Sequence, residues 1–142
     1  MTAKEYLQQA FLLDRSIKAK ERQLEALKDR ATYSTPQLDK EAQHSTLIKS
    51  RLEENTVKIV ELEKSINLKV QEMERLRQEI GRTIEAVNNP ECEAVLQMRY
   101  LSFMNWEEIA SRLDISVRNV YRFHGKALSL VHVPQQDMRK TS

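Results

Sequence analysis

The stretch that decides the fold runs from residue 105 to residue 122 and reads Asn105-Trp-Glu-Glu-Ile-Ala-Ser-Arg-Leu-Asp-Ile-Ser-Val-Arg-Asn-Val-Tyr-Arg122. Asn105 with Glu108 three residues later has the spacing of a capping box, with Asn in place of Ser or Thr. This predicts a helix from Trp106 to Leu113. Ser116 is a second good N-cap, so a further helix is predicted from Val117 to about Val131.

The apolar residues of these two helices recur at helical spacing, which gives each helix one packing face. The predicted packing residues are Trp106, Ile109, Ala110 and Leu113 on the first helix and Val117, Val120, Phe123 and Ala127 on the second. Two short helices joined by a turn of about three residues are typical of a helix-turn-helix. The pattern therefore predicts that motif, with Ile115 filling the turn.

A further helix is predicted just upstream. Asn89 is a suitable cap with Pro90 in the favoured first position, and the apolar residues Ala94, Val95, Met98 and Leu101 share one face. The helix should run from about Pro90 to Leu101. These three helices define a predicted domain over residues 89–133, and residues 134–142 are predicted to be a disordered tail because they lack apolar periodicity.

The outer face of the last predicted helix is polar and basic. Its residues are Arg118, Asn119, Tyr121, Arg122 and Lys126, and no carboxylate occurs between Ser116 and Val133. An α-helix fits the major groove of double-stranded DNA, where Arg can bind guanine and Asn can bind adenine, while Lys126 is placed for a phosphate. The alternative is an ordinary solvated face, on which Tyr121 would only close the edge of the core.

Residues 1–88 have the composition and periodicity of long paired helices. One helix is predicted from Ala3 to Ala31, and a second starts at Thr35-Pro36 and reaches Val87. The second keeps a heptad period, as coiled coils do. Its seam is Ile48, Leu52, Asn55, Ile59, Leu62, Ile66, Lys69, Met73, Leu76, Ile80, Thr83 and Val87. The fold class is therefore all-α: an N-terminal helical hairpin or coiled coil followed by a three-helix domain.

Polar residues interrupt this seam. Asn55 and Lys69 either fix register or lie in a hydrated stretch. The first helix is too short to cover all of the second, so the apolar seam at Ile66–Val87 is expected to need another partner helix. Self-association as a dimer is the simplest way to provide it. Gly81 falls on the outer face, as a hinge or as a tolerated surface glycine.

Several functional classes are disfavoured. Cys92 is the only cysteine, which excludes an intramolecular disulfide and a cysteine-rich zinc site. The three histidines do not suggest a metal site, although His124 could touch a phosphate. We see no catalytic constellation and expect neither enzyme activity nor a cofactor. Without a signal peptide or an apolar span, a location in the bacterial cytoplasm and no membrane partner are expected.

The motif residues resemble region 4 of bacterial sigma factors. The resemblance rests on Glu93-Ala-Val-Leu-Gln-Met-Arg-Tyr-Leu101, on the 105–122 stretch and on Lys126-Ala-Leu128. It implies that Arg118, Tyr121 and Arg122 contact the upstream promoter element. Asp114 replaces a frequent turn glycine and Gly125 stands where Ala is common. Nothing upstream resembles the promoter-melting region 2, so a complete sigma factor is not expected.

A coiled coil followed by such a domain resembles small regulators encoded by prophages, of the ArpU and RinA kind. The leading hypothesis is therefore a sequence-specific DNA-binding transcriptional regulator of phage origin. Two alternatives stay open: a small-terminase-like packaging component, which would form rings, and an interaction protein that docks on RNA polymerase or a sigma factor without binding DNA.

Overall fold

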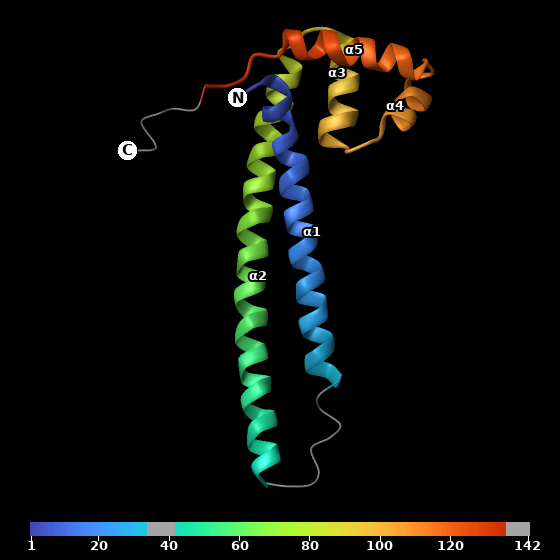
Figure 1. The fold of residues 1–142 in the computed structure, drawn as a ribbon. Coiled ribbons are helices and arrows are strands. Elements are labelled where there is room, and N and C mark those ends of the chain that lie inside the picture. The colour runs from blue at the N-terminus through green and yellow to red at the C-terminus, as the bar shows by residue number, and fades with distance from the viewer. Residues whose placement is uncertain (34–41, 136–142) are drawn as a thin grey trace. The chain divides into compact units, whose positions relative to one another are not determined.

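The computed structural model describes residues 1–33 and 42–135, and this part of the chain consists of helices and connecting segments without a strand. The helices are α1 (Ala3–Tyr33), α2 (Ala42–Glu85), α3 (Pro90–Leu96), η2 (Gln97–Leu101), α4 (Trp106–Leu113) and α5 (Val117–Leu130), shown in Figure 1. The all-α prediction is confirmed. The predicted start at Thr35-Pro36, and the predicted tail from residue 136 onward, lie outside the described residues.

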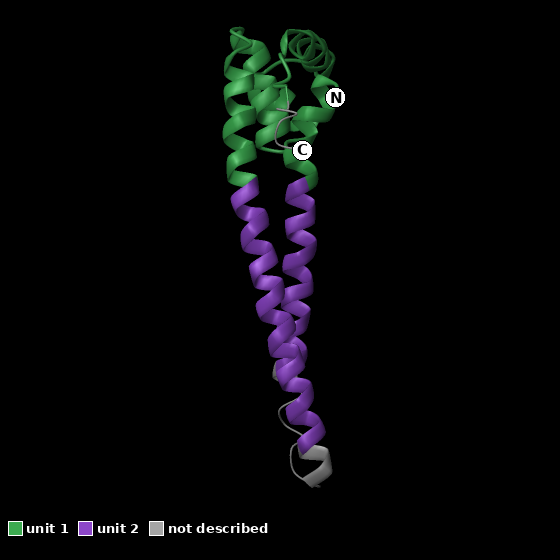
Figure 2. Cartoon of the chain, turned by 90° about the vertical axis from the view of Figure 1, so that its left-hand side faces the viewer, with its two compact units in different colours: residues 1–12, 73–142 green, residues 13–72 purple. Residues whose placement is uncertain are grey.

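The chain forms two compact units, coloured separately in Figure 2. Unit 1 comprises Met1–Leu12 and Met73–Ser142, and unit 2 comprises Leu13–Glu72. A boundary at Asn89 was expected. Instead, the first turns of α1 and the last turns of α2 belong to the same unit as the short helices, because they pack against them.

In unit 1, α1 runs beside the C-terminal part of α2. The Tyr6 hydroxyl lies 3.3 Å from the Thr83 hydroxyl, and both side chains are buried. The seam residues Met73, Leu76, Ile80 and Val87 are buried as well. Our expectation that the seam from Ile66 to Val87 needs a second chain was therefore wrong, because α1 itself covers this end of α2.

In unit 2, α1 and α2 pack along the predicted heptad seam. Ile17, Ile48 and Ile66 are buried, and Lys28 Nζ lies 3.4 Å from Glu63 Oε1 across the helix pair. Asn55 and Lys69 are half-buried at their seam positions. Every predicted seam position from Ile48 to Val87 is buried or half-buried.

The helix predicted upstream of α4 begins at the predicted cap but is not a single α-helix. Asn89 caps α3 by accepting a hydrogen bond from the Cys92 amide at 3.2 Å, with Pro90 in the first position. The predicted single helix to Leu101, however, changes into a π-helical turn at Gln97. Phe103 follows with a φ of 57°, a left-handed conformation that is costly for a large side chain. Within the described residues, no helix combines the length and the apolar character needed to cross a bilayer.

Candidate nucleic-acid interface

The candidate interface is the outer face of α5. Ser116 caps this helix, because its Oγ accepts the Asn119 amide at 3.1 Å. Arg118, Arg122 and Lys126 are exposed, Tyr121 is half-exposed and Asn119 is half-buried. The opposite face is buried through Val120, His124 and Ala127, so the polar residues are held outward by the packing of α5 itself.

Helix α4 and the turn after it fix where α5 lies. Val95, Ile109, Ala110 and Val120 form a buried core, against which the side chains Met98, Met104, Trp106, Leu113, Ile115, Val117 and Phe123 pack. The Ile115 amide donates to the Ala110 carbonyl at 3.1 Å, which closes the turn. Asp114 ends α4 with φ 54° and ψ 46°, the left-handed conformation that a glycine adopts without strain.

The side chains of Asn105 and Glu108 cap the start of α4. The Glu108 amide donates to Asn105 Oδ1 at 2.8 Å, as the capping-box pattern predicts. The Glu108 carboxylate accepts from the Asn105 side-chain amide, also at 2.8 Å, rather than from its backbone. This reciprocal pair stabilises the first turn of α4 and holds Trp106 against the core.

Two residues of the outer face also make contacts within the protein. The Tyr121 ring lies against the Trp106 ring with centroids 4.9 Å apart, while half of its surface stays exposed. The Arg122 guanidinium lies 5.6 Å from the centre of the Phe123 ring. Both contacts restrict long side chains that still reach solvent, which lowers the entropy lost on binding a ligand.

The charges of α5 are not neutralised within the described part of the chain. No ion pair there involves Arg118, Arg122 or Lys126, whereas pairs such as Arg75–Glu79 and Lys18–Asp14 occur on the other helices. Helix α5 itself has no acidic residue. The face is therefore a local positive surface on a chain whose formal net charge is only +2.

His124 belongs to the interior, which contradicts its suggested role as a phosphate contact. Its Nε2 lies 2.6 Å from the Tyr100 hydroxyl, and its ring meets the Trp106 ring edge-on at 4.7 Å. Burial, followed by the positive charges of Lys4 and Arg99, lowers the pKa of His124 to about 4. The imidazole is thus neutral at pH 7 and joins η2 to α5.

Cys92 is also an interior group. It is fully buried, and its Sγ lies 3.8 Å from the Phe123 carbonyl oxygen. Burial raises the pKa of the Cys92 thiol, although the nearby Lys126 charge lowers it. The first turn of a helix can favour a thiolate, but burial dominates here and the thiol is protonated and inaccessible.

One group of residues was missed by the sequence analysis: the support behind η2. The Arg77 guanidinium donates to the Leu101 carbonyl at 2.8 Å and lies 5.9 Å from the Phe103 ring centre. The Phe11 ring meets the Phe103 ring edge-on at 5.7 Å. No local sequence signal relates Phe11 to Phe103, since the contact depends on how α1 packs.

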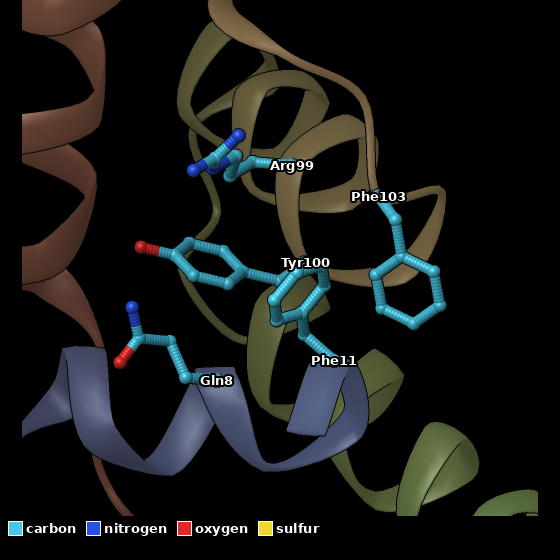
Figure 3. Close-up of a pocket in the computed structure, with 5 residues that line it drawn as sticks. All are labelled: Gln8, Phe11, Arg99, Tyr100 and Phe103. Atoms are coloured by element: carbon cyan, nitrogen blue, oxygen red, sulfur yellow. The ribbon is translucent and has the colours of Figure 1, made fainter. Parts of the chain in front are cut away.

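A small pocket opens beside this support, lined by Gln8, Phe11, Arg99, Tyr100 and Phe103 (Figure 3). Its volume is about 90 Å³, well below the roughly 300 Å³ at which small-molecule sites begin. Arg99 is already engaged, because its Nη1 donates to the Met104 carbonyl at 3.0 Å and its guanidinium stacks 4.3 Å from Trp106. The pocket is therefore a packing gap, and the described residues contain no cluster suited to a metal ion.

The comparison with known families concerns this same region. Residues 34–132 match the family described as "Protein of unknown function (DUF1492)". The chain belongs to the DUF1492 family. The matched segment of this DUF1492 protein contains α2 to α5, and so the entire candidate interface, whereas α1 precedes it. No curated protein and no solved structure matches the chain.

Proposed function

We propose that the protein is a sequence-specific regulator of transcription that binds double-stranded DNA through α5. In this proposal α4, the turn and α5 act as a helix-turn-helix of the sigma region 4 type, carried by the α1–α2 hairpin. The observation that carries it is the outer face of α5, where three exposed cations share one side of a capped helix and have no carboxylate partner among the described residues.

The roles of the residues follow from their positions along α5. Arg118, Asn119 and Arg122 lie in the N-terminal half, the end that reaches base edges in this motif. Arg can form two hydrogen bonds to guanine and Asn two to adenine. Tyr121 packs along the neighbouring sugar–phosphate strand from its place beside Trp106, and Lys126, one turn later, contacts a phosphate.

The biological setting proposed is a phage or prophage gene switch. It rests on the resemblance of residues 93–128 to sigma region 4 and on the hairpin that precedes them. The residues that precede the motif in this sequence do not resemble a promoter-melting region, so we propose that the protein acts beside a complete polymerase rather than replacing its sigma factor.

The test is DNA binding by the full chain carrying Arg118→Ala and Arg122→Ala together. Selection from a random DNA pool first gives the preferred site. We expect the double variant to lose this preference, because each bidentate base contact contributes about 1–3 kcal/mol of discrimination. Its helical content should be unchanged, since both side chains are exposed.

The matched control is Arg51→Ala with Lys58→Ala, which removes the same charge from exposed positions of α2. If binding used only the overall charge, both pairs would weaken it equally. Unchanged sequence preference in the Arg118/Arg122 variant would refute the assignment. A wild-type chain that enriches no sequence but retains RNA polymerase would instead support the interaction-protein alternative.

A further inference from the structure

Gly125 is unusual because no contact with another described residue explains why this position lacks a side chain. It lies on the exposed face of α5, and its φ is not positive. A Cβ added there would meet nothing within 4 Å. A glycine inside a helix destabilises that helix relative to alanine. Among the described residues, neither the backbone conformation nor the packing at Gly125 offsets this loss of helix stability.

The exposed side chains beside Gly125 include two cations and a hydroxyl. Arg122 precedes it by one turn, Lys126 follows directly and Ser129 lies one turn later, all exposed. The Ser129 hydroxyl donates to the Lys126 carbonyl at 2.6 Å in the free protein. Two cations and a hydroxyl therefore border a bare patch of helix backbone on a helix without acidic residues.

Gly81 shows what a glycine without this setting looks like. It also lies within a helix, and a Cβ there would also meet nothing within 4 Å. Its neighbours along α2 include Arg77, which donates to the Leu101 carbonyl, and Arg82, but also the carboxylate Glu85. At both glycines a Cβ would meet nothing within 4 Å, but Gly81 is half-buried beside a carboxylate, whereas Gly125 is exposed on a helix without acidic residues.

From this difference we infer that a DNA sugar–phosphate strand lies directly against the backbone of α5 at Gly125. The inference rests on the proposed DNA-binding function and divides α5 into two parts. The N-terminal half reads bases, and the segment from Gly125 to Ser129 receives a phosphodiester. A side chain at residue 125 would hold the strand away from Lys126 and Ser129, so the absence of a Cβ sets how closely α5 approaches DNA.

The experiment compares Gly125→Ala and Gly125→Leu with Gly81→Ala and Gly81→Leu in the full chain. Both alanine variants should unfold at a temperature equal to or above that of the wild type, because alanine favours the helix. Only the Gly125 variants should bind DNA more weakly, by several-fold for alanine and by more than about tenfold for leucine.

The way in which binding is lost identifies the contact. Because a phosphodiester contact is independent of sequence, the Gly125 variants should weaken binding to the selected site and to random DNA alike. The slope of affinity against salt should stay as in the wild type, whereas Lys126→Ala should reduce it by about one. Arg118→Ala should instead erode the preference for the selected site.

The outcomes separate this inference from the function on which it rests. If Gly125→Leu binds DNA as tightly as the wild type while the Arg118/Arg122 variant loses its preference, the inference is wrong and the proposed function stands. If Gly81→Leu weakens binding as much as Gly125→Leu, steric access at residue 125 is not the cause and the inference is also wrong. If the wild-type chain binds no DNA, both fall.

Discussion

The two units of this chain bury their apolar residues very unevenly. Among the described residues, the buried hydrophobic side chains belong to unit 1 except for Ile17, Ile48 and Ile66, and all the largest fully buried ones, such as Leu7, Ile84 and Ile109, are in unit 1. Unit 2 leaves Leu47, Val57 and Leu68 more than half exposed. Unit 1 is stabilised by a core of its own, whereas a helix pair alone leaves unit 2 with apolar surface free for a partner.

The largest expected effect tests this difference directly. Ile84→Ala in unit 1 should lower the free energy of unfolding by about 3–4 kcal/mol, because it leaves a cavity in an enclosed core. Ile66→Ala in unit 2 should cost only about 1–2 kcal/mol, since solvent reaches a two-helix contact more easily. Urea unfolding followed by helical circular dichroism, with Trp106 fluorescence as a reporter of unit 1, measures both. Equal losses would refute the comparison.

A second effect concerns the buried imidazole of unit 1. The pKa of His124 is lowered from 6.5 to about 4, so the unfolded chain binds more protons between these values and stability rises with pH across this window. The contribution is complete above pH 6.5 and is lost as the pH falls toward 4. We expect it to be about 2 kcal/mol, since one pKa unit corresponds to about 1.4 kcal/mol and the ring retains some solvent contact.

The measurement is urea unfolding at a series of pH values for the wild type and His124→Gln. The variant should show a shallower fall in stability from pH 6.5 to pH 4. His132→Gln is the matched control, because His132 is exposed after the end of α5. If the free energy of unfolding falls equally steeply between pH 6.5 and pH 4 in the wild type and in His124→Gln, protonation of His124 does not cause the fall.

A smaller effect is expected at the turn between α4 and α5. Asp114→Gly should raise the free energy of unfolding of unit 1 by about 0.5 kcal/mol, because glycine adopts the left-handed conformation without the steric cost of a Cβ. Asp114→Ala should lower it by about 1 kcal/mol. Thermal unfolding of the three proteins gives the order. Alanine and glycine variants of equal stability would show that the turn conformation does not matter.

The smallest effect on folding should come from the exposed apolar residues of unit 2. Val57→Ser with Leu68→Ser should change the free energy of unfolding of the monomer by less than about 0.5 kcal/mol. The same pair should weaken dimer formation in sedimentation experiments, since these side chains offer apolar surface to a second copy. If the wild type is dimeric and the double variant sediments in the same way, Val57 and Leu68 do not form the dimer contact.

Local signals in the sequence predicted most of the helices and their ends. Heptad spacing identified the α2 seam, and the caps Asn89, Asn105 and Ser116 were each placed correctly, because a cap depends only on neighbours a few residues away. The residues Arg118, Arg122 and Lys126 were likewise expected on the outside of α5, and they are exposed there.

Contacts between distant segments were not predictable in the same way. The Phe11–Phe103 and Tyr100–His124 contacts depend on how α1 and α5 pack, and a single sequence does not encode such pairings by spacing. The same limit led to the error over the Ile66–Val87 seam. Helical periodicity shows which face is apolar, but not which segment of the chain covers it.

The discontinuity of unit 1 has a consequence for the order of events during synthesis. Met1–Leu12 leaves the ribosome before the rest of unit 1, which resumes at Met73 and includes α5. The first turns of α1 therefore have to wait for most of the chain, and Tyr6, Leu7 and Ala10 stay open to solvent until then. Contacts across so many residues close slowly. The unit proposed to bind DNA is thus completed only after α5 has been synthesised, so a nascent chain that stops before α5 cannot complete it.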